Sequence, residues 1–288
     1  DWETLKATYE TNQYYPATLE WNGVRVQNVG IRSRGNGSRS GVKPGLRVDA
    51  NRYVADRRFL GLKSFVLRNN TQDASQMRER LAMRLFRQLG LPAPREAHAR
   101  LFVNGSFAGL YSIVESIDRR FLEDRFGDDD GYLYDYEFPP DEAPYYFEHR
   151  GIEPEHYVPR PFSPETHEND PRGDVVERLV RVVNAPSTAS FRQSIDEYLD
   201  LNGVIRHLAT EVFLGEQDGL LGDWGMNNLY LYRPADSTRF SMIPWDKSQT
   251  FSDGPSRSIW RNITDQPPDR RNRLVMQILA DDELRQRY

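Results

Sequence analysis

The stretch that decides the fold runs from "GDWGMNNLYLY", residues 222–232, to "MIPWDKSQTF", residues 242–251. "LYLY" and "MIPW" are short apolar runs with polar turn residues between them, which predicts two antiparallel strands joined by a hairpin. Polar residues stand at the outer ends of the pair: Asp223 and Asn228 precede the first strand, and Asp246 follows the second. Because a hairpin brings its two ends together, we expect Asn228 and Asp246 to lie within reach of one metal ion.

The order of these polar residues is typical of phosphoryl-transfer chemistry. In protein kinases an Asp orients the acceptor hydroxyl, an Asn five residues later binds Mg²⁺, and a second Asp after the next strand pair binds it as well. On spacing alone, an ordinary role of Asp223 and Asn228 as turn residues is the stronger interpretation. Asp246 is harder to explain in that way, because a carboxylate that follows the apolar "MIPW" is costly to bury without a cation.

Length and composition exclude several classes of protein. At 288 residues the chain is long enough for two domains or for one large domain with two lobes. A mean hydropathy of -0.74, with no run of about 18 apolar residues, predicts a globular protein without a membrane span. The net charge of -5 argues against nucleic-acid binding. The absence of cysteine excludes disulfides, thiolate metal sites and cysteine nucleophiles.

The first third of the chain is predicted to be rich in strands, with one strong helix. "LRVDA" (46–50) and "FVLR" (65–68) have strand patterns, and Asn104-Gly105 between two apolar runs is a strong hairpin signal. The segment 73–90 predicts a helix that begins at Asp73 and ends at Gly90. Its apolar residues recur every four positions and are expected to pack on the sheet: Met77, Leu81, Leu85 and Leu89.

The remainder is predicted to be mostly helical. Residues 137–171 are rich in proline, acidic and aromatic residues, which indicates a long ordered insertion without regular structure. Helical patterns return at 174–185 and at 190–215. We therefore predict an α+β protein with a β-rich lobe at 1–115 and a larger, mostly helical lobe at 116–288.

Five sequence blocks together are similar to the CotH family, which is named for a bacterial spore-coat protein. In chain order they are "RGNGSRSGVKPGLRV", "RNNTQDASQMRERLAMRLFRQLG", "LFVNGSFAGLYSIVESID", "GDWGMNNLYLYR" and "MIPWDKSQTF". They span about residues 31 to 251, most of the chain. The resemblance implies an atypical protein-kinase-like fold with two lobes, and transfer of phosphate from ATP to Ser or Thr of protein substrates, including autophosphorylation. It also implies Mg²⁺ or Mn²⁺ as cofactor and a secreted, cell-surface or spore-coat location in bacteria.

The resemblance implies specific roles for the polar residues of the hairpin. Asp223 corresponds to the catalytic base and Asp246 to the metal-binding Asp, while Asn228 fits the second metal ligand with Asn227 as its competitor. Family members commonly read Trp-Asp-x-Asp where this chain has Ser248 in place of the second Asp. That replacement implies an altered activity or metal preference.

The glycine-rich stretch "RGNGSRSGVKP" is the candidate nucleotide-phosphate loop. It is not a P-loop, because no Gly-Lys-Ser/Thr follows at the required spacing. Its glycines would let backbone N–H groups approach phosphates, its basic residues would add charge, and a basic hairpin tip is the alternative. The residues concerned are Arg34, Gly35, Gly37, Arg39, Gly41 and Lys43. Lys43 is the predicted phosphate-contacting lysine, with Lys63 as its rival.

Three further assignments complete the predicted site. Arg78 or Glu79 could take the place of the helix residue that pairs with the phosphate lysine in kinases, although surface charges of this kind are common. Glu115 and Ile117, after the predicted hairpin, would fall at the lobe junction near the adenine.

Two other functions compete with the kinase prediction. One is a scaffold protein of kinase-like shape that has lost turnover, which the replacement at Ser248 motivates. The other is a metal-dependent phosphoester hydrolase built on four aspartates, namely Asp218, Asp223, Asp246 and Asp253. A kinase would use ATP and protein acceptors as partners, and no nucleic acid.

Overall fold

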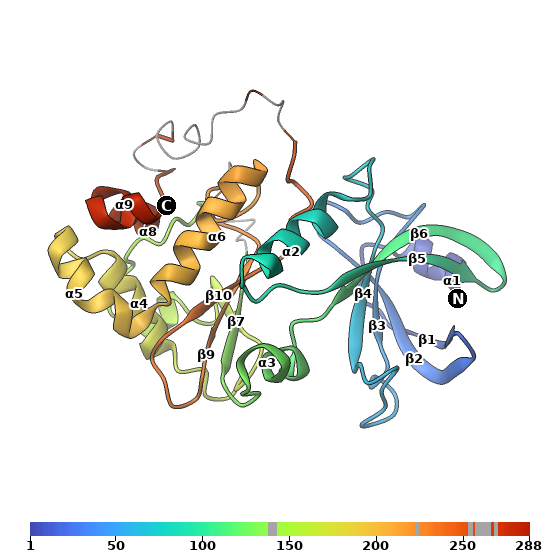
Figure 1. Ribbon diagram of the computed structural model, residues 1–288. Coiled ribbons are helices and arrows are strands. Elements are labelled where there is room, and N and C mark those ends of the chain that lie inside the picture. The colour runs from blue at the N-terminus through green and yellow to red at the C-terminus, as the bar shows by residue number, and fades with distance from the viewer. Residues whose placement is uncertain (138–142, 223–224, 253–255, 257–265, 268–269) are drawn as a thin grey trace. The chain divides into compact units, whose positions relative to one another are not determined.

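A computed structural model describes residues 1–137, 143–222, 225–252, 256, 266–267 and 270–288. The chain is a mixed α+β protein that divides into two compact units (Figure 1). Unit 1 contains Asp1–Arg80 and Pro94–Ile117, and unit 2 contains Leu81–Ala93 and Asp118–Tyr288. The division therefore falls within the helix predicted at 73–90, so that residues 81–93 belong with the later part of the chain.

Unit 1 is built on a six-stranded antiparallel sheet in the order β1-β2-β3-β4-β6-β5. Its elements are α1 (Trp2–Ala7), β1 (Tyr15–Trp21), β2 (Val24–Arg34), β3 (Gly45–Asp49), β4 (Ser64–Arg68), β5 (Glu96–Val103) and β6 (Ser106–Glu115). The strands predicted at 46–50 and 65–68 are confirmed as β3 and β4. Apolar side chains from β2, β3, β4 and β6 form its core together with Leu5 of α1.

The hairpin predicted at Asn104-Gly105 joins β5 to β6, as the sequence indicated. Asn104 and Gly105 have φ values of 51° and 81°, the left-handed conformation that a type I′ turn requires of both central residues. The prediction is confirmed together with its physical reason.

Helix α2 (Arg78–Gln88) corrects the predicted packing face. Its buried apolar residues are Ala82, Met83 and Phe86, whereas Leu81 and Leu89 of the predicted stripe are 47% and 42% exposed. Steps of four residues overshoot a 3.6-residue turn by about 40° each, so a long run of such steps winds away from one face. The prediction that this stripe packs on the sheet is wrong.

The predicted start of this helix at Asp73 is wrong, because α2 begins at Arg78 and Gln76 before it has a left-handed φ of 56°, whereas the predicted end at Gly90 is confirmed. Asp73 lies before the helix, and its carboxylate accepts hydrogen bonds from the N–H groups of Ser75 and Arg78, each at 2.9 Å. Gly90 follows the helix with φ of 74°, and the N–H of Leu91 donates to the carbonyl of Phe86 at 3.0 Å. This is the glycine-dependent closure of a helix C-terminus.

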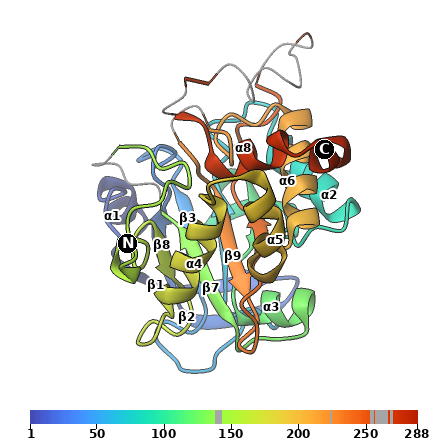
Figure 2. The same cartoon turned by 90° about the vertical axis from the view of Figure 1, so that its left-hand side faces the viewer.

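Unit 2 contains a four-stranded antiparallel sheet in the order β10-β9-β7-β8. The strands are β7 (Tyr132–Tyr136), β8 (Phe162–Pro164), β9 (Leu229–Arg233) and β10 (Ser241–Pro244). The helices are α3 (Arg119–Phe126), α4 (Gly173–Val183), α5 (Thr188–Tyr198), α6 (Leu201–Leu214), α8 (Arg273–Ala280) and α9 (Asp282–Arg287), with the 3₁₀ turn η1 (Pro154–His156). Figure 2 shows α4 and α5 in front of β7 and β9, and residues of these elements share one apolar core.

The insertion predicted at 137–171 is ordered in its described part, but it is not free of regular structure. It contributes strand β8, which pairs with β7. The rings of Tyr145, Phe147, Tyr157 and Phe162 are fully buried. These aromatic residues explain how such a polar, proline-rich segment is held in place.

The single helical pattern predicted at 190–215 consists of two helices. Leu199 between them has extended backbone angles, and the N–H of Asp200 donates to the carbonyl of Phe240 at 2.8 Å. Asp200 then caps α6 by accepting from the N–H of Gly203. Helix α6 runs beside β10 (Figure 1) and leads directly into the segment before the predicted site.

Within the described ranges, none of the helices combines the length and the apolar character needed to cross a membrane.

Candidate functional site

The β9–β10 hairpin brings Asn228 and Asp246 to the same end, as predicted. Leu229 pairs with Pro244 in the antiparallel ladder. One residue further out, the N–H of Trp245 donates to the carbonyl of Asn228 at 3.0 Å. The residue before β9 and the residue after Trp245 therefore stand side by side.

Asp218 joins this group from the segment that follows α6. The side-chain amides of Asn227 and Asn228 each donate to its carboxylate at 2.9 Å, and Asn228 also donates to its backbone carbonyl at 2.8 Å. The N–H of Asn227 donates to the carbonyl of Gly219 at 3.0 Å. Asp218 thus lies against Asn227 and Asn228, which gives the site a carboxylate that the Asp-x4-Asn spacing did not single out.

Two carboxylates oppose each other at this point. Burial raises the pKa of Asp218, and the negative charge of Asp246 raises it further, while hydrogen bonds from Asn227 and Asn228 act in the opposite direction. Asp246 has a φ of 41°, a left-handed conformation that Asp and Asn tolerate better than most residues. The positive charge of Lys247 also lowers the pKa of Asp218 and so offsets part of the repulsion between the two carboxylates.

Asp223, the predicted base, lies outside the described residues, and so does Asp253 of the hydrolase hypothesis. The role of Asp223 stays a prediction. Asn227 and Asn228 both reach Asp218, so the structure brings both candidate asparagines to the site. Asn228 also contacts the β10 side, because its carbonyl accepts from the N–H of Trp245.

Where the chain is described, the structure contains no group of three or more His, Cys, Asp or Glu side chains arranged to hold a metal. Among the described residues, the cluster at the hairpin end combines the carboxylates of Asp218 and Asp246 with the side-chain amides of Asn227 and Asn228, and the ammonium of Lys247 donates to the Asn228 carbonyl. Carboxylate and amide oxygens are ligands that suit Mg²⁺ and Ca²⁺ rather than Zn²⁺.

Glu216 is a buried carboxyl group directly beside the site. One of its oxygens accepts from the N–H of Asp218 at 2.8 Å, while within the described part of the chain the other is buried without a hydrogen bond. Burial raises its pKa to about 8, although the positive charge of Lys247 opposes the shift. Glu216 is therefore protonated in the folded chain at neutral pH.

This pKa predicts a pH-dependent loss of stability. Between about pH 4.5 and pH 8 the unfolded chain releases the Glu216 proton while the folded chain keeps it, so rising pH favours unfolding, by up to about 1.4 kcal/mol per pH unit. Glu216→Gln has no proton to release, so we expect this pH-dependent loss of stability to disappear in the variant. Relative to the native chain, the free energy of unfolding of the variant should therefore increase between pH 4.5 and pH 8. Urea unfolding at several pH values measures it. The exposed Glu123→Gln on α3 is the control, and a pH-independent difference for Glu216→Gln would contradict the prediction.

In unit 1, the glycine-rich loop connects β2 to β3. Gly35 has a φ of 122°, a conformation that favours glycine. Arg39 donates to the carbonyls of Gly35, Tyr9 and Thr11 at 2.6, 2.9 and 3.0 Å. These bonds give its guanidinium a structural role in holding the loop. Arg34 is the last residue of β2, and Gly37 lies within the loop.

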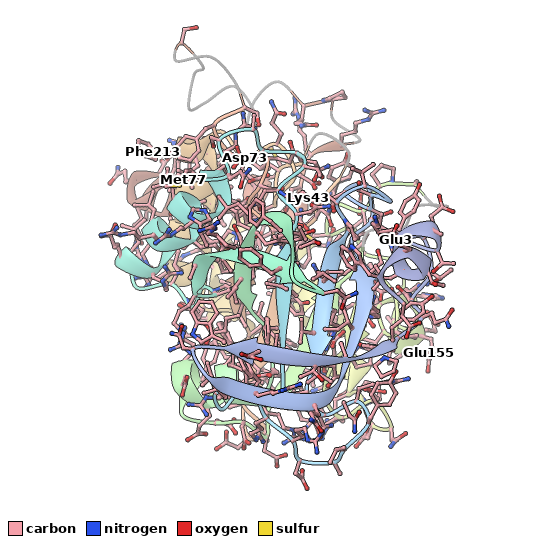
Figure 3. All side chains as sticks on the ribbon, turned by 90° about the vertical axis from the view of Figure 1, so that its right-hand side faces the viewer. Glu3, Lys43, Asp73, Met77, Glu155 and Phe213 are labelled. Carbon is pink, nitrogen blue, oxygen red and sulfur yellow. The ribbon has the colours of Figure 1, made fainter. Side chains whose placement is uncertain are left out.

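Lys43 is held above the sheet of unit 1. Its ammonium lies 5.0 Å from the centre of the Tyr111 ring on β6, and partial burial lowers its pKa. The amide of Asn69, just after β4, donates to the carbonyl of Lys43 at 2.8 Å. Lys43 and Asp73 both lie near the end of the sheet where β4 finishes (Figure 3). The rival Lys63 is exposed, just before β4.

A buried ion pair connects β4 to α2. Arg68, the last residue of β4, contacts Glu79 in the first turn of α2 at 2.8 Å, and both side chains are nearly buried, at 11% and 7% exposure. Arg78 and Glu79 were the two candidates for the helix residue that pairs with a strand residue in kinases, and Glu79 has such a partner in Arg68. Sequence analysis missed Arg68, because nothing in "FVLRNN" distinguishes a paired strand-end arginine from an exposed one.

Glu115 and Ile117 end unit 1. The carboxylate of Glu115 is buried and accepts from the N–H of Arg95 and from its guanidinium Nε, both at 2.9 Å. Ile117 is half-buried. The proximity of either residue to an adenine stays a prediction.

Comparisons with known proteins identify the family of the chain. A family model described as CotH kinase protein matches residues 31–288, so the chain belongs to the CotH family, as the sequence blocks predicted. It is 25% identical over 252 residues to the inner spore coat protein H of Bacillus subtilis (strain 168). That alignment covers 87% of this chain and 66% of the relative, so the chain spans slightly less than two thirds of the relative's length.

Proposed function

We propose that this chain is a divalent-metal-dependent phosphotransferase that moves the γ-phosphate of ATP to Ser or Thr hydroxyls of proteins, its own included. The observation that supports it most is the meeting of Asp218, Asn228 and Asp246 at one end of the β9–β10 hairpin. Membership of a family described as kinase protein supports the same chemistry.

The residues present suit Mg²⁺ or Mn²⁺. Asp246 and the amide oxygen of Asn228 are hard donors that would hold the ion. The bound ion would neutralise phosphate charge. Burial is the main cause of the raised pKa of Asp218, and the negative charge of Asp246 adds to it; a bound divalent ion would relieve that part of the shift.

Asp218 is our candidate for the carboxylate that orients the acceptor hydroxyl. Its side chain is fixed by two amide donors, which leaves it little freedom to turn. Its raised pKa also makes it a better proton acceptor than an exposed Asp. Asp223, which has the Asp-x4-Asn spacing, remains the alternative for the same role.

Under this proposal the two units correspond to the two lobes of a protein-kinase-like fold, with unit 1 binding the nucleotide. Lys43 would contact the phosphates, aided by the backbone of the loop at Gly35 and Gly37 and by Arg34. The buried Arg68–Glu79 pair would take the place of the strand–helix ion pair of kinases. Glu115 and Ile117 would lie near the adenine.

The substrate class and location are part of the proposal. The relative's name places that protein in the inner spore coat. We propose protein substrates of a spore coat or cell surface for this chain as well.

The two lysines give a prediction that separates them. Lys43→Ala is expected to raise the KM for ATP by about tenfold or more, because a charged hydrogen bond to phosphate is worth roughly 1.5–3 kcal/mol. Lys63→Ala should leave the KM for ATP nearly unchanged and act, if at all, on stability. Steady-state kinetics with ATP as the varied substrate decides, and the reverse pattern would move the role to Lys63.

Product stoichiometry tests the proposed function against its two competitors. The purified chain is incubated with Mg-ATP and a Ser-rich peptide, and ADP and free phosphate are both measured. A phosphotransferase forms ADP in excess of free phosphate, because the phosphate stays on hydroxyl groups. A hydrolase forms the two in equal amounts and also cleaves simple phosphoesters. A scaffold binds Mg-ATP in calorimetry and forms neither product.

A further inference from the structure

A buried carboxylate on α6 is connected to the segments that carry Asp218, Asn228 and Asp246. Glu211 is 3% exposed and accepts from three donors. One oxygen is 2.6 Å from the ammonium of Lys247 and 2.9 Å from Nε2 of His207. The other accepts from the N–H of Leu220 at 2.8 Å. Leu220 lies two residues after Asp218.

Lys247 extends this connection to the other two site residues. It follows Asp246 directly, its side chain is fully buried, and its ammonium donates to the carbonyl of Asn228 at 3.0 Å. One ammonium group thus joins Glu211 to both ends of the hairpin at the point where Asn228 and Asp246 meet.

Gly219 shows how closely the carboxylate approaches the Asp218 segment. A Cβ atom at this position would lie 2.5 Å from both carboxylate oxygens of Glu211, a distance that such atoms do not adopt. Any larger residue here would displace the Glu211 carboxylate from its present position, so glycine allows the loop to approach it this closely.

The buried ion pair of Glu211 and Lys247 is unlike an apolar contact, because its formation requires the removal of two charged groups from water. Removing two ions from water costs several kcal/mol per ion, and well-packed hydrophobic replacements of buried pairs are often as stable. Burial alone would raise the pKa of Glu211, but Lys247 and His207 outweigh it and lower that pKa to about 2. The carboxylate is ionised throughout the neutral range, and its directional contacts hold specific backbone atoms as apolar contacts cannot.

We propose that Glu211, acting through Lys247 and the N–H of Leu220, is a positioning residue that fixes the Asp218, Asn228 and Asp246 segments relative to one another. The role it would serve, alignment for metal binding and phosphotransfer, rests on the proposed function. The fixed arrangement itself is a property of the folded chain without ligands. Neither Glu211 nor Lys247 needs to touch a substrate.

The test compares three variants with the native chain. Lys247→Met leaves Glu211 charged and unpaired with its lysine, which should destabilise the fold. The double variant Glu211→Met/Lys247→Met has no charge at either position, and we expect its melting temperature to be close to that of the native chain. The control is His207→Phe, which removes a hydrogen bond to Glu211 while keeping a ring against Phe86, 5.1 Å away. The side-chain hydrogen bond of His207 is made to Glu211, on its own helix, and not to the backbone of the three segments.

Hydrogen exchange without metal or nucleotide is the first readout. The N–H groups of Asn227 and Trp245 report on the segments, because their acceptors, the carbonyls of Gly219 and Asn228, are unchanged by the substitutions. In the double variant we expect about tenfold faster exchange at both positions, and no such change in His207→Phe. Native exchange at both positions in a stably folded double variant overturns the proposal. So does equal acceleration in the control.

Turnover is the second readout and separates this inference from the proposed function. We expect kcat of the double variant to fall by about 10²-fold with a smaller change in KM, as for a misplacement of about 1 Å. If the native chain transfers no phosphate, the proposed function is refuted. The hydrogen-exchange result then still decides whether Glu211 fixes the three segments. A native chain that transfers phosphate, with a double variant of native kcat, refutes the positioning role alone.

Discussion

Asp246→Asn is expected to reduce phosphotransfer by at least about 10²-fold without destabilising the chain. The substitution removes the carboxylate best placed to hold a divalent ion, and such an ion is worth several kcal/mol to a phosphoryl transition state. Asn tolerates the positive φ of 41° at this position, so the backbone should not change. Removing one of two opposed carboxylates also relieves repulsion with Asp218, which should keep the melting temperature equal or raise it.

The measurements for Asp246→Asn are kcat, calorimetric Mg-ATP affinity and melting temperature. Asp236→Asn is the matched control, because Asp236 is exposed in the turn at the other end of the same hairpin. Lost turnover together with weakened Mg-dependent nucleotide binding supports the metal role. Unchanged affinity and turnover would show that Asp246 binds no catalytic metal.

Asp218→Asn is expected to lower kcat by about 10²- to 10⁴-fold, the usual contribution of a positioned acid or base. Its effect on Mg-ATP affinity should be smaller than that of Asp246→Asn, because the orienting carboxylate contacts the acceptor hydroxyl. Asn keeps an oxygen that can accept from Asn227 or Asn228, so the loop should stay folded.

Asp223→Asn, measured in parallel, decides between the two candidates for this role. If Asp218 is the orienting residue, Asp223→Asn keeps most of its kcat. If kcat collapses only in Asp223→Asn while both proteins melt normally, the base is Asp223 and Asp218 serves the loop.

Local chemistry made much of the fold predictable. Asn104-Gly105 specified a turn because few other residue pairs adopt two positive φ values, and Gly90 marked the end of α2 for a similar reason. Asp73 indicated the N-terminal region of α2 but not its first residue, which is Arg78. The packing face of α2 was not predictable from periodicity. Which of two apolar stripes becomes buried depends on long-range neighbours such as Leu214 of α6, which shares a core with Phe86.

The candidate site was predictable where it depends on strand pairing. Asn228 and Asp246 flank two recognisable strands, so their meeting follows from the hairpin. Asp218 could not be ranked above Asp223, because residue spacing does not reveal that the amides of Asn227 and Asn228 donate to Asp218. The one available signal was the pair Asn227-Asn228, two adjacent amide donors that need acceptors. In the sequence, Lys247 occupies a position that resembles an exposed turn, yet its side chain is fully buried and pairs with Glu211. Because Glu211 lies much earlier in the chain, the local sequence does not reveal this partner.

Transfer of label from γ-labelled ATP to protein, with Mg²⁺ and again with excess EDTA, tests the central claim most directly. We predict label on Ser or Thr of the chain and of an added acceptor protein in Mg²⁺, none in EDTA, and none with Asp246→Asn in either condition. Nucleotide binding without any label on protein in Mg²⁺ or Mn²⁺, or equal labelling by the native chain and Asp246→Asn, would contradict it.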